Sequence, residues 1–143
     1  MGISKLAVVG ATGNVGREML NILSERNFPC EEVIALASER SEGDAVPFGN
    51  KELIVQSLSS YDFSETSIAL FSAGGKISEV YGPIAAEQGC IVIDNSSKFR
   101  MDNDVPLIVP EVNIEMLEHY RTTNIIANPN CSTIQMVVAL KPL

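Results

Sequence analysis

The sequence is poor in residues that bind metals and in basic residues. It has one histidine and three cysteines, and no two cysteines lie close in sequence, so the usual ligand spacing of a metal site is missing. Lysine and arginine number 10 against 18 aspartates and glutamates, which gives a net charge of −8. Because phosphate backbones need clustered Lys and Arg, this balance argues against a nucleic-acid partner. The sequence predicts neither a metal nor a nucleic acid as ligand.

Long apolar runs are missing as well. No run approaches the ~20 residues that a membrane helix needs, and the first residues enter an apolar run too early to leave room for a signal peptide. An odd number of cysteines without a leader indicates thiols rather than disulfides. We therefore expect a cytoplasmic protein without a membrane partner. Its 143 residues, 45% hydrophobic and 20% charged, are typical of one globular domain.

Apolar runs alternate with helical patterns along the chain. Strands are predicted over 5–10, 33–37, 53–55, 67–71, 91–94, 107–109 and 125–127, and helices over 14–26, 77–88, 113–120 and from 131 onward. Pro83 should kink or divide the second helix, and Asn113 should cap the third, with Glu115 in its first turn. This alternation predicts an α/β fold with a doubly wound, mostly parallel, Rossmann-like sheet and right-handed crossovers.

Three glycines, Gly10, Gly13 and Gly16, lie between the first predicted strand and the first predicted helix. Their G-x-x-G-x-x-G spacing is a variant of the dinucleotide fingerprint, in which glycine lets the backbone approach a pyrophosphate at a helix N-terminus. The pattern predicts a dinucleotide cofactor, and the alternative is a turn that merely needs glycine.

The residues after the second strand bear on which dinucleotide is bound. NAD sites usually present a carboxylate to the ribose there, whereas this sequence has Ser38, Glu39, Arg40 and Ser41. Arg40 and the serines can hold a 2′-phosphate, which favours NADP over NAD. Glu39 could point at the ribose or into solvent.

Cys131 follows an apolar run and an Asn-Pro-Asn turn, and it opens another apolar run. A strand, a turn and a helix in that order would place its thiol at a helix N-terminus, where unpaired N–H groups and the dipole stabilise an anion. A thiolate there is a candidate nucleophile, and the alternative is a buried cysteine. Cys30 and Cys90 precede apolar runs and are expected to be structural. His119 is expected at the surface rather than beside Cys131.

The segment 94–100, Asp-Asn-Ser-Ser-Lys-Phe-Arg, follows the fifth predicted strand. Strand ends line the ligand crevice in such sheets. Two hydroxyls with the guanidinium of Arg100 are a candidate oxyanion clamp, since Arg binds phosphate through paired hydrogen bonds. The alternative is a solvated polar turn.

Five motifs in order closely resemble aspartate-β-semialdehyde dehydrogenase. They are Gly-Ala-Thr-Gly-Asn-Val-Gly (10–16), Phe-Ser-Ala-Gly-Gly (71–75), Asp-Asn-Ser-Ser-x-Phe-Arg (94–100), Val-Pro-Glu-Val-Asn (109–113) and Asn-Pro-Asn-Cys-Ser-Thr-Ile-Gln (128–135). The resemblance implies an enzyme that reduces β-aspartyl phosphate with NADPH to aspartate semialdehyde and phosphate. That reaction belongs to lysine, methionine and threonine biosynthesis.

The resemblance also implies roles for individual residues. Cys131 would be acylated as a thioester, with Asn130 positioning the reacting group, and Arg100 would bind phosphate. We assign Asn95 and Ser97, two polar residues of the segment 94–100, to the same phosphate site. The implied cofactor contacts are Gly10, Thr12, Gly13, Asn14, Val15 and Gly16 at the pyrophosphate, Ser38, Arg40 and Ser41 at the 2′-phosphate, and Ser72, Ala73 and Gly74 beside the nicotinamide.

The family continues into a substrate domain that supplies a general-base histidine, a glutamine, an arginine and a lysine, and none can be matched here. We therefore expect residues 1–143 to form a dinucleotide-binding domain that ends just after the cysteine helix, without the substrate and dimerisation domain. Such a chain should bind cofactor without turnover, and the full-length enzyme should be a homodimer. The alternatives are a stand-alone nucleotide-binding module, an acetylglutamyl-phosphate reductase, or an enzyme like glyceraldehyde-phosphate dehydrogenase.

Overall fold

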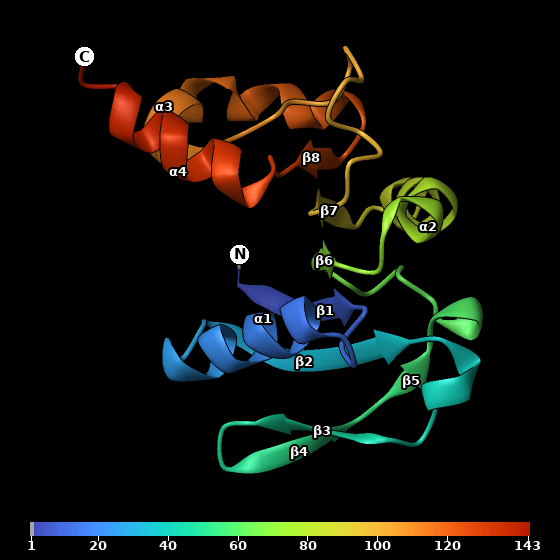
Figure 1. The fold of residues 1–143 in the computed structure, drawn as a ribbon. Coiled ribbons are helices and arrows are strands. Elements are labelled where there is room, and N and C mark those ends of the chain that lie inside the picture. The colour runs from blue at the N-terminus through green and yellow to red at the C-terminus, as the bar shows by residue number, and fades with distance from the viewer. Residues whose placement is uncertain (1) are drawn as a thin grey trace.

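The computed structural model describes residues 2–143 as a central sheet with helices on both faces and a small hairpin at one end (Figure 1). Its elements in chain order are β1 (Ile3–Val9), α1 (Asn14–Glu25), β2 (Cys30–Ala37), a 3₁₀ turn (Glu39–Ser41), β3 (Ala45–Phe48), β4 (Lys51–Ile54), β5 (Gln56–Ser57), a 3₁₀ turn (Leu58–Ser60), β6 (Ile68–Phe71), α2 (Gly75–Glu87), β7 (Ile91–Asp94), α3 (Pro110–Asn113), a 3₁₀ helix (Ile114–Thr122), β8 (Ile125–Ala127) and α4 (Cys131–Leu140).

The main sheet has the order β5-β2-β1-β6-β7-β8, and every neighbouring pair is parallel. Counted along the chain, the order of these strands is 3-2-1-4-5-6, the order of dinucleotide-binding sheets. The direction of winding reverses between β1 and β6, and ligands bind at this switch point in open α/β sheets. The doubly wound, mostly parallel fold expected from the sequence is confirmed.

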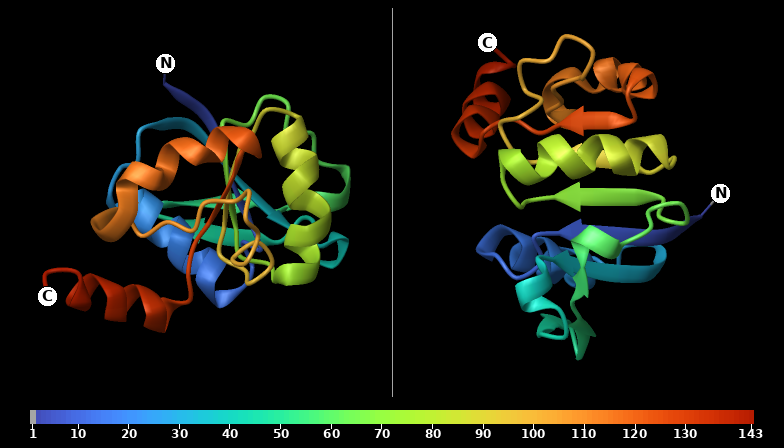
Figure 2. Two further views of the ribbon diagram at one scale, coloured as in Figure 1. Left: turned by 90° about the horizontal axis from the view of Figure 1, so that it is seen from above. Right: turned by 90° about the vertical axis from the view of Figure 1, so that its right-hand side faces the viewer.

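The first strand shows why its apolar run is continuous. Ala7 and Val9 pack in the cluster that contains Ala85 of α2, whereas Leu6 and Val8 pack in the cluster that contains Leu20 of α1. The two helices cover opposite faces of the sheet (Figure 2). Successive side chains therefore point into different cores, and both must be apolar.

Two predicted strands differ in the structure. The run 53–55 does not join the main sheet: Leu53 belongs to β4, which pairs antiparallel with β3 in a separate hairpin. Gly49, with φ of +61°, makes the turn between them. The run 107–109 forms one isolated bridge, from Leu107 to Ala127. Prolines on both sides of that run cannot donate backbone hydrogen bonds, so no strand extends from it.

Two helix expectations also need correction. The second helix begins at Gly75 and is not divided at Pro83. Asn113 does not cap a following α-helix, because its side chain accepts a hydrogen bond from Val109 N and donates one to Leu107 O, both at 2.9 Å. The chain beyond it is a 3₁₀ helix rather than the expected α-helix.

Within residues 2–143, no helix is long and apolar enough to cross a membrane. The same residues contain no cluster of three His, Cys, Asp or Glu side chains arranged to bind a metal.

Candidate active site and cofactor cleft

A cleft of about 630 Å³ opens at the carboxyl ends of β1, β2 and β6, at the switch point of the sheet. Its lining residues are Gly10, Thr12, Gly13, Ala37, Ser38, Glu39, Arg40, Leu58, Ser59, Ser72, Ala73, Ile77 and Tyr81. The predicted residues that it brings together are Gly10, Thr12, Gly13, Ser38, Arg40, Ser72 and Ala73. They come from the loops after β1, β2 and β6, which lie far apart in sequence.

Two glycines allow the first loop to turn tightly. Gly10 has φ of +86°, and a Cβ on it would lie 2.9 Å from the backbone carbonyl of Ser72. A Cβ on Gly16 would lie 2.1 Å from the carbonyl oxygen of Gly10. The loop is also tied to β2, since the N–H groups of Gly10 and Ala11 both donate to Leu36 O, at 2.9 and 3.1 Å. Only glycine permits this close approach of loop, helix and strand.

The N-terminus of α1 is suited to an anion. The helix has 12 residues, and its N-cap is Gly13, which has no side chain to accept from the first-turn N–H groups. Those N–H groups and the helix dipole favour a bound phosphate. Arg17 Nε donates to Thr12 O at 3.1 Å and holds the preceding turn in place. The residues present therefore fit the pyrophosphate of a dinucleotide.

The second loop brings opposite charges into the same cleft. Glu39 and Arg40 lie in one 3₁₀ turn directly after β2. Ser59 Oγ donates to Glu39 Oε1 at 2.7 Å. Within the part of the chain that the structure describes, the ion pairs are Lys5–Glu65 and Lys98–Glu79. Neither charge of this turn is neutralised by an ion pair in that part.

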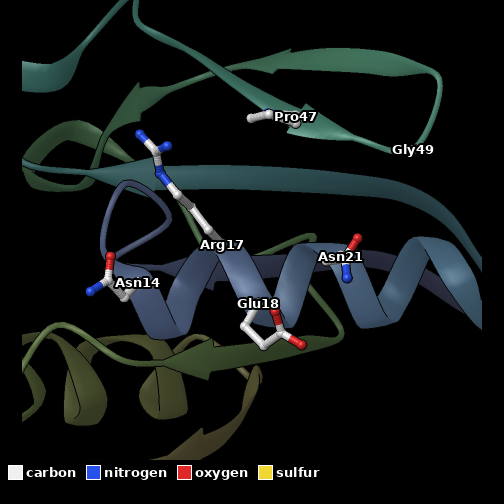
Figure 3. A pocket seen from close by; sticks show the side chains of 6 residues that line it. All are labelled: Asn14, Arg17, Glu18, Asn21, Pro47 and Gly49. Carbon is white, nitrogen blue, oxygen red and sulfur yellow. The ribbon is translucent and has the colours of Figure 1, made fainter.

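Five predicted cofactor residues do not line the cleft: Asn14, Val15, Gly16, Ser41 and Gly74. Gly16 is buried beneath the loop. Asn14 lines a second hollow of about 370 Å³ between α1 and the β3–β4 hairpin (Figure 3). The other lining residues of that hollow are Arg17, Glu18, Asn21, Pro47 and Gly49.

Sequence reasoning missed five lining residues: Ala37, Leu58, Ser59, Ile77 and Tyr81. Ile77 and Tyr81 are four residues apart and therefore share one face of α2, a spacing that could have indicated them. Leu58 and Ser59 follow β5, whose two residues are too few to show a pattern.

Cys131 is the first residue of α4, as expected, and it is exposed rather than buried in a strand–helix corner. Asn130 caps the helix, with its side-chain Oδ1 accepting from Ser132 N at 2.9 Å. The same oxygen lies 4.0 Å from Cys131 Sγ. Since all main-sheet strands are parallel, this turn after β8 lies at the same sheet edge as the cleft.

The other two thiols have different surroundings. Burial raises the pKa of Cys90 to about 12. Burial also raises the pKa of the half-buried Cys30, against an opposing effect of the Lys51 charge. His119 is exposed on the 3₁₀ helix, as expected. Cys131 is thus the accessible thiol of the three.

Arg100 joins the loops after β7 and β8. Its Nε donates to Asn128 O at 2.9 Å and its Nη2 donates to Asn95 O at 3.0 Å. Asn128 Nδ2 in turn donates to Asn95 Oδ1 at 2.7 Å. Arg has five N–H donors, so the guanidinium can position these loops and still offer donors to an anion.

The segment that carries Arg100 is anchored by a fully buried carboxylate. Asp94 accepts from Ser78 Oγ and Ser96 Oγ, each at 2.6 Å, and from Ser96 N at 3.2 Å. Ser97 is exposed beside the start of α2. The segment is more than a solvated polar turn, since Asp94 and Ser96 are buried.

The glycine loop at the switch point lies within the segment that a family comparison matches. The model of the family described as semialdehyde dehydrogenase, NAD binding domain, matches residues 5–120. The chain belongs to the semialdehyde dehydrogenase family.

The individual proteins that this chain resembles are also semialdehyde dehydrogenases. Aspartate-semialdehyde dehydrogenase 2 of Vibrio cholerae is 58% identical over 138 residues, which are 96% of this chain and 41% of that protein. The chain thus spans about two fifths of the length of this relative. The resemblance to aspartate-β-semialdehyde dehydrogenase found in the five motifs is confirmed.

Two solved structures show the same fold. Aspartate semialdehyde dehydrogenase II of Vibrio cholerae, complexed with ASA, has a TM-score of 0.93 at 58% identity and covers 96% of this chain and 45% of that chain. The enzyme of Candida albicans, with NADP, has a TM-score of 0.84 at 27% identity and covers 98% of this chain and 46% of that chain.

Proposed function

We propose that this chain is the dinucleotide-binding domain, residues 1–143, of an NADP-dependent aspartate-semialdehyde dehydrogenase. The protein would convert β-aspartyl phosphate to aspartate semialdehyde and phosphate, in the biosynthesis of lysine, methionine and threonine. The observation that carries the proposal is the exposed Cys131 at the head of α4, on the sheet edge that holds the glycine-loop cleft. The relatives named aspartate-semialdehyde dehydrogenase support the choice of substrate.

The proposed chemistry begins at the sulfur of Cys131. Its thiolate attacks the acyl carbon of the acyl phosphate, a C–S bond forms, and the C–O bond to phosphate breaks. The released phosphate takes hydrogen bonds from the free donors of Arg100, while Asn130 positions the reacting group. When held by the cleft residues, NADPH would supply the hydride that brings the thioester carbon to the aldehyde level. The C–S bond then breaks, its electron pair returns to the sulfur of Cys131, and the aldehyde leaves.

The cleft residues have separate proposed roles in holding the cofactor. Gly10, Thr12 and Gly13, with the head of α1, bind the pyrophosphate. Ser72 and Ala73 lie beside the nicotinamide. Ser38 and Arg40, which line the cleft, hold the 2′-phosphate, and the NADP named with the Candida albicans enzyme supports this choice.

The preference for NADP is tested by Arg40→Ala with calorimetric titration of NADP and NAD. A charge-assisted hydrogen bond contributes about 1.5–3 kcal/mol, so the variant should bind NADP at least tenfold more weakly and NAD almost as before. Arg26→Ala is the matched control, since Arg26 is exposed at the far end of α1. Equal losses for both cofactors would refute the role of Arg40.

The 143 residues by themselves are proposed to bind cofactor without turnover, because no general-base histidine or substrate-binding set is matched in them. NADPH binding without oxidation in the presence of substrate is the expected result, and turnover by these residues alone would contradict it. The cytoplasmic location and the homodimer of the full-length enzyme stay predictions.

A further inference from the structure

The ribose end of the cleft carries two specificity elements that usually exclude each other. An acidic residue after the second strand of such a sheet binds the ribose hydroxyls of NAD, whereas an arginine there accommodates the 2′-phosphate of NADP. Here Glu39 and Arg40 are adjacent residues of one 3₁₀ turn, and both line the cleft.

The carboxylate of Glu39 is oriented by a chain of hydroxyl groups. Ser59 Oγ donates its proton to Glu39 Oε1 at 2.7 Å, and it lies 3.0 Å from Ser57 Oγ. Because the one proton of Ser59 goes to Glu39, Ser57 is the donor to Ser59. Ser57 is buried in β5, which pairs with the end of β2 through Ala37. The position of Glu39 is thereby set by the main sheet.

The hydrogen bond from Ser59 leaves acceptor capacity on the carboxylate of Glu39. A carboxylate has about four lone-pair sites, and Ser59 occupies one, so Glu39 can still accept from a ribose hydroxyl. No ion pair of Glu39 is present among residues 2–143, where the two ion pairs involve Lys5 and Lys98. No ion pair therefore offsets its negative charge beside a 2′-phosphate held by the neighbouring Arg40.

We infer that Glu39 is a specificity-determining residue: its carboxylate, positioned by Ser59, accepts from the 2′-hydroxyl of NAD and repels the 2′-phosphate of NADP. The inference rests on the proposed dinucleotide site. Its consequence is a domain that binds both cofactors, with the preference for NADP given by Arg40 and limited by Glu39.

Calorimetric titration of NADP and NAD into the wild-type chain, Glu39→Gln and Ser59→Ala tests this role. Glu39→Gln removes the charge and keeps the size, so the ratio of NADP to NAD affinity should rise about tenfold. Ser59→Ala should weaken NAD binding severalfold and NADP binding less, because the carboxylate of Glu39 keeps its charge but loses the hydrogen bond that orients it. Glu42→Gln is the matched control, since Glu42 is exposed just after the same turn and does not line the cleft.

The outcomes separate this inference from the proposed function. One outcome is that the wild-type chain binds both cofactors while Glu39→Gln leaves the ratio of NADP to NAD affinity unchanged. That result overturns the role of Glu39 and leaves the dinucleotide site standing. An equal shift in Glu42→Gln also overturns it, because the effect would then come from net charge alone. Absence of binding of either cofactor to a folded wild-type chain overturns the dinucleotide site itself, and the role of Glu39 falls with it.

Discussion

At the scale of single residues, the three cysteines show how position decides chemistry. Cys131 is exposed at the head of α4, whereas burial raises the pKa of Cys90 to about 12 and also raises that of Cys30. A raised thiol pKa lowers the fraction of thiolate at neutral pH, and the thiolate is the reactive form. Iodoacetamide at pH 7 should therefore alkylate Cys131 much faster than the other two.

Mass spectrometry of the alkylated protein gives the three rates separately. Phosphate should slow the reaction of Cys131 by binding at Arg100, and NADP should slow it by covering the cleft. Raising the pH should increase the labelling of Cys90 last, since its pKa is the one at about 12. Equal rates for all three cysteines would remove the support for Cys131 as the nucleophile.

Residue positions that depend on local sequence could be predicted, and contacts that depend on tertiary structure could not. The glycine loop and Cys131 are each defined by a strand, a turn and a helix that are contiguous in the chain. The hydrogen bond from Ser59 to Glu39 joins two loops 20 residues apart. It exists because β5 pairs with β2, and a two-residue strand carries no periodicity from which that pairing could be predicted.

At the scale of elements, the contact of α1 with the loop after β1 depends on Gly16. A Cβ there would meet the Gly10 carbonyl oxygen at 2.1 Å, so Gly16→Ala forces backbone atoms apart. Overpacking of this kind costs about 1–3 kcal/mol. The free energy of unfolding, measured by urea titration, should fall by that amount, and NADP binding should weaken because the loop is displaced.

A glycine-to-alanine substitution in α2 is the control, and its expected effect on stability has the opposite sign. Gly75 is the first residue of that helix, and a Cβ there would have ordinary contacts of 3.9 and 4.0 Å. Gly75→Ala should stabilise the protein by about 0.4–1 kcal/mol, because alanine restricts the unfolded chain. A Gly16→Ala protein as stable as Gly75→Ala would show that the loop does not need the close contact.

The correctly predicted elements are of two kinds. Some have both faces buried in apolar cores, and others have one apolar and one polar face. β1, with side chains in two cores, and α1, with one apolar side, belong to these. The hairpin β3–β4 was not predicted, since its strands of four residues are largely exposed and carry little apolar pattern. The 3₁₀ helix after Asn113 was expected to be α-helical because spacing alone does not separate the two forms.

At the scale of the whole molecule, the strand order brings all the proposed chemistry to one edge of the sheet. Parallel strands end on the same side, so the loops after β1, β2, β6, β7 and β8 all contribute there. Helix α4 starts at this edge and projects from the body of the molecule (Figure 2). None of its residues is buried, although most of them are apolar.

The exposed side of α4 leads to a prediction about association of the 143-residue chain. Met136 and Leu140 lie one helical turn apart and are 55% and 53% exposed. Contiguous apolar patches on a surface promote association, so this chain should self-associate in sedimentation experiments at micromolar concentration. The double variant Met136→Glu with Leu140→Lys should shift it toward monomer, because two charges would have to be buried. Met101→Gln is the control, since Met101 is 92% exposed on a loop outside α4. A monomeric wild-type chain, or equal effects of both variants, would show that α4 is not an associating surface.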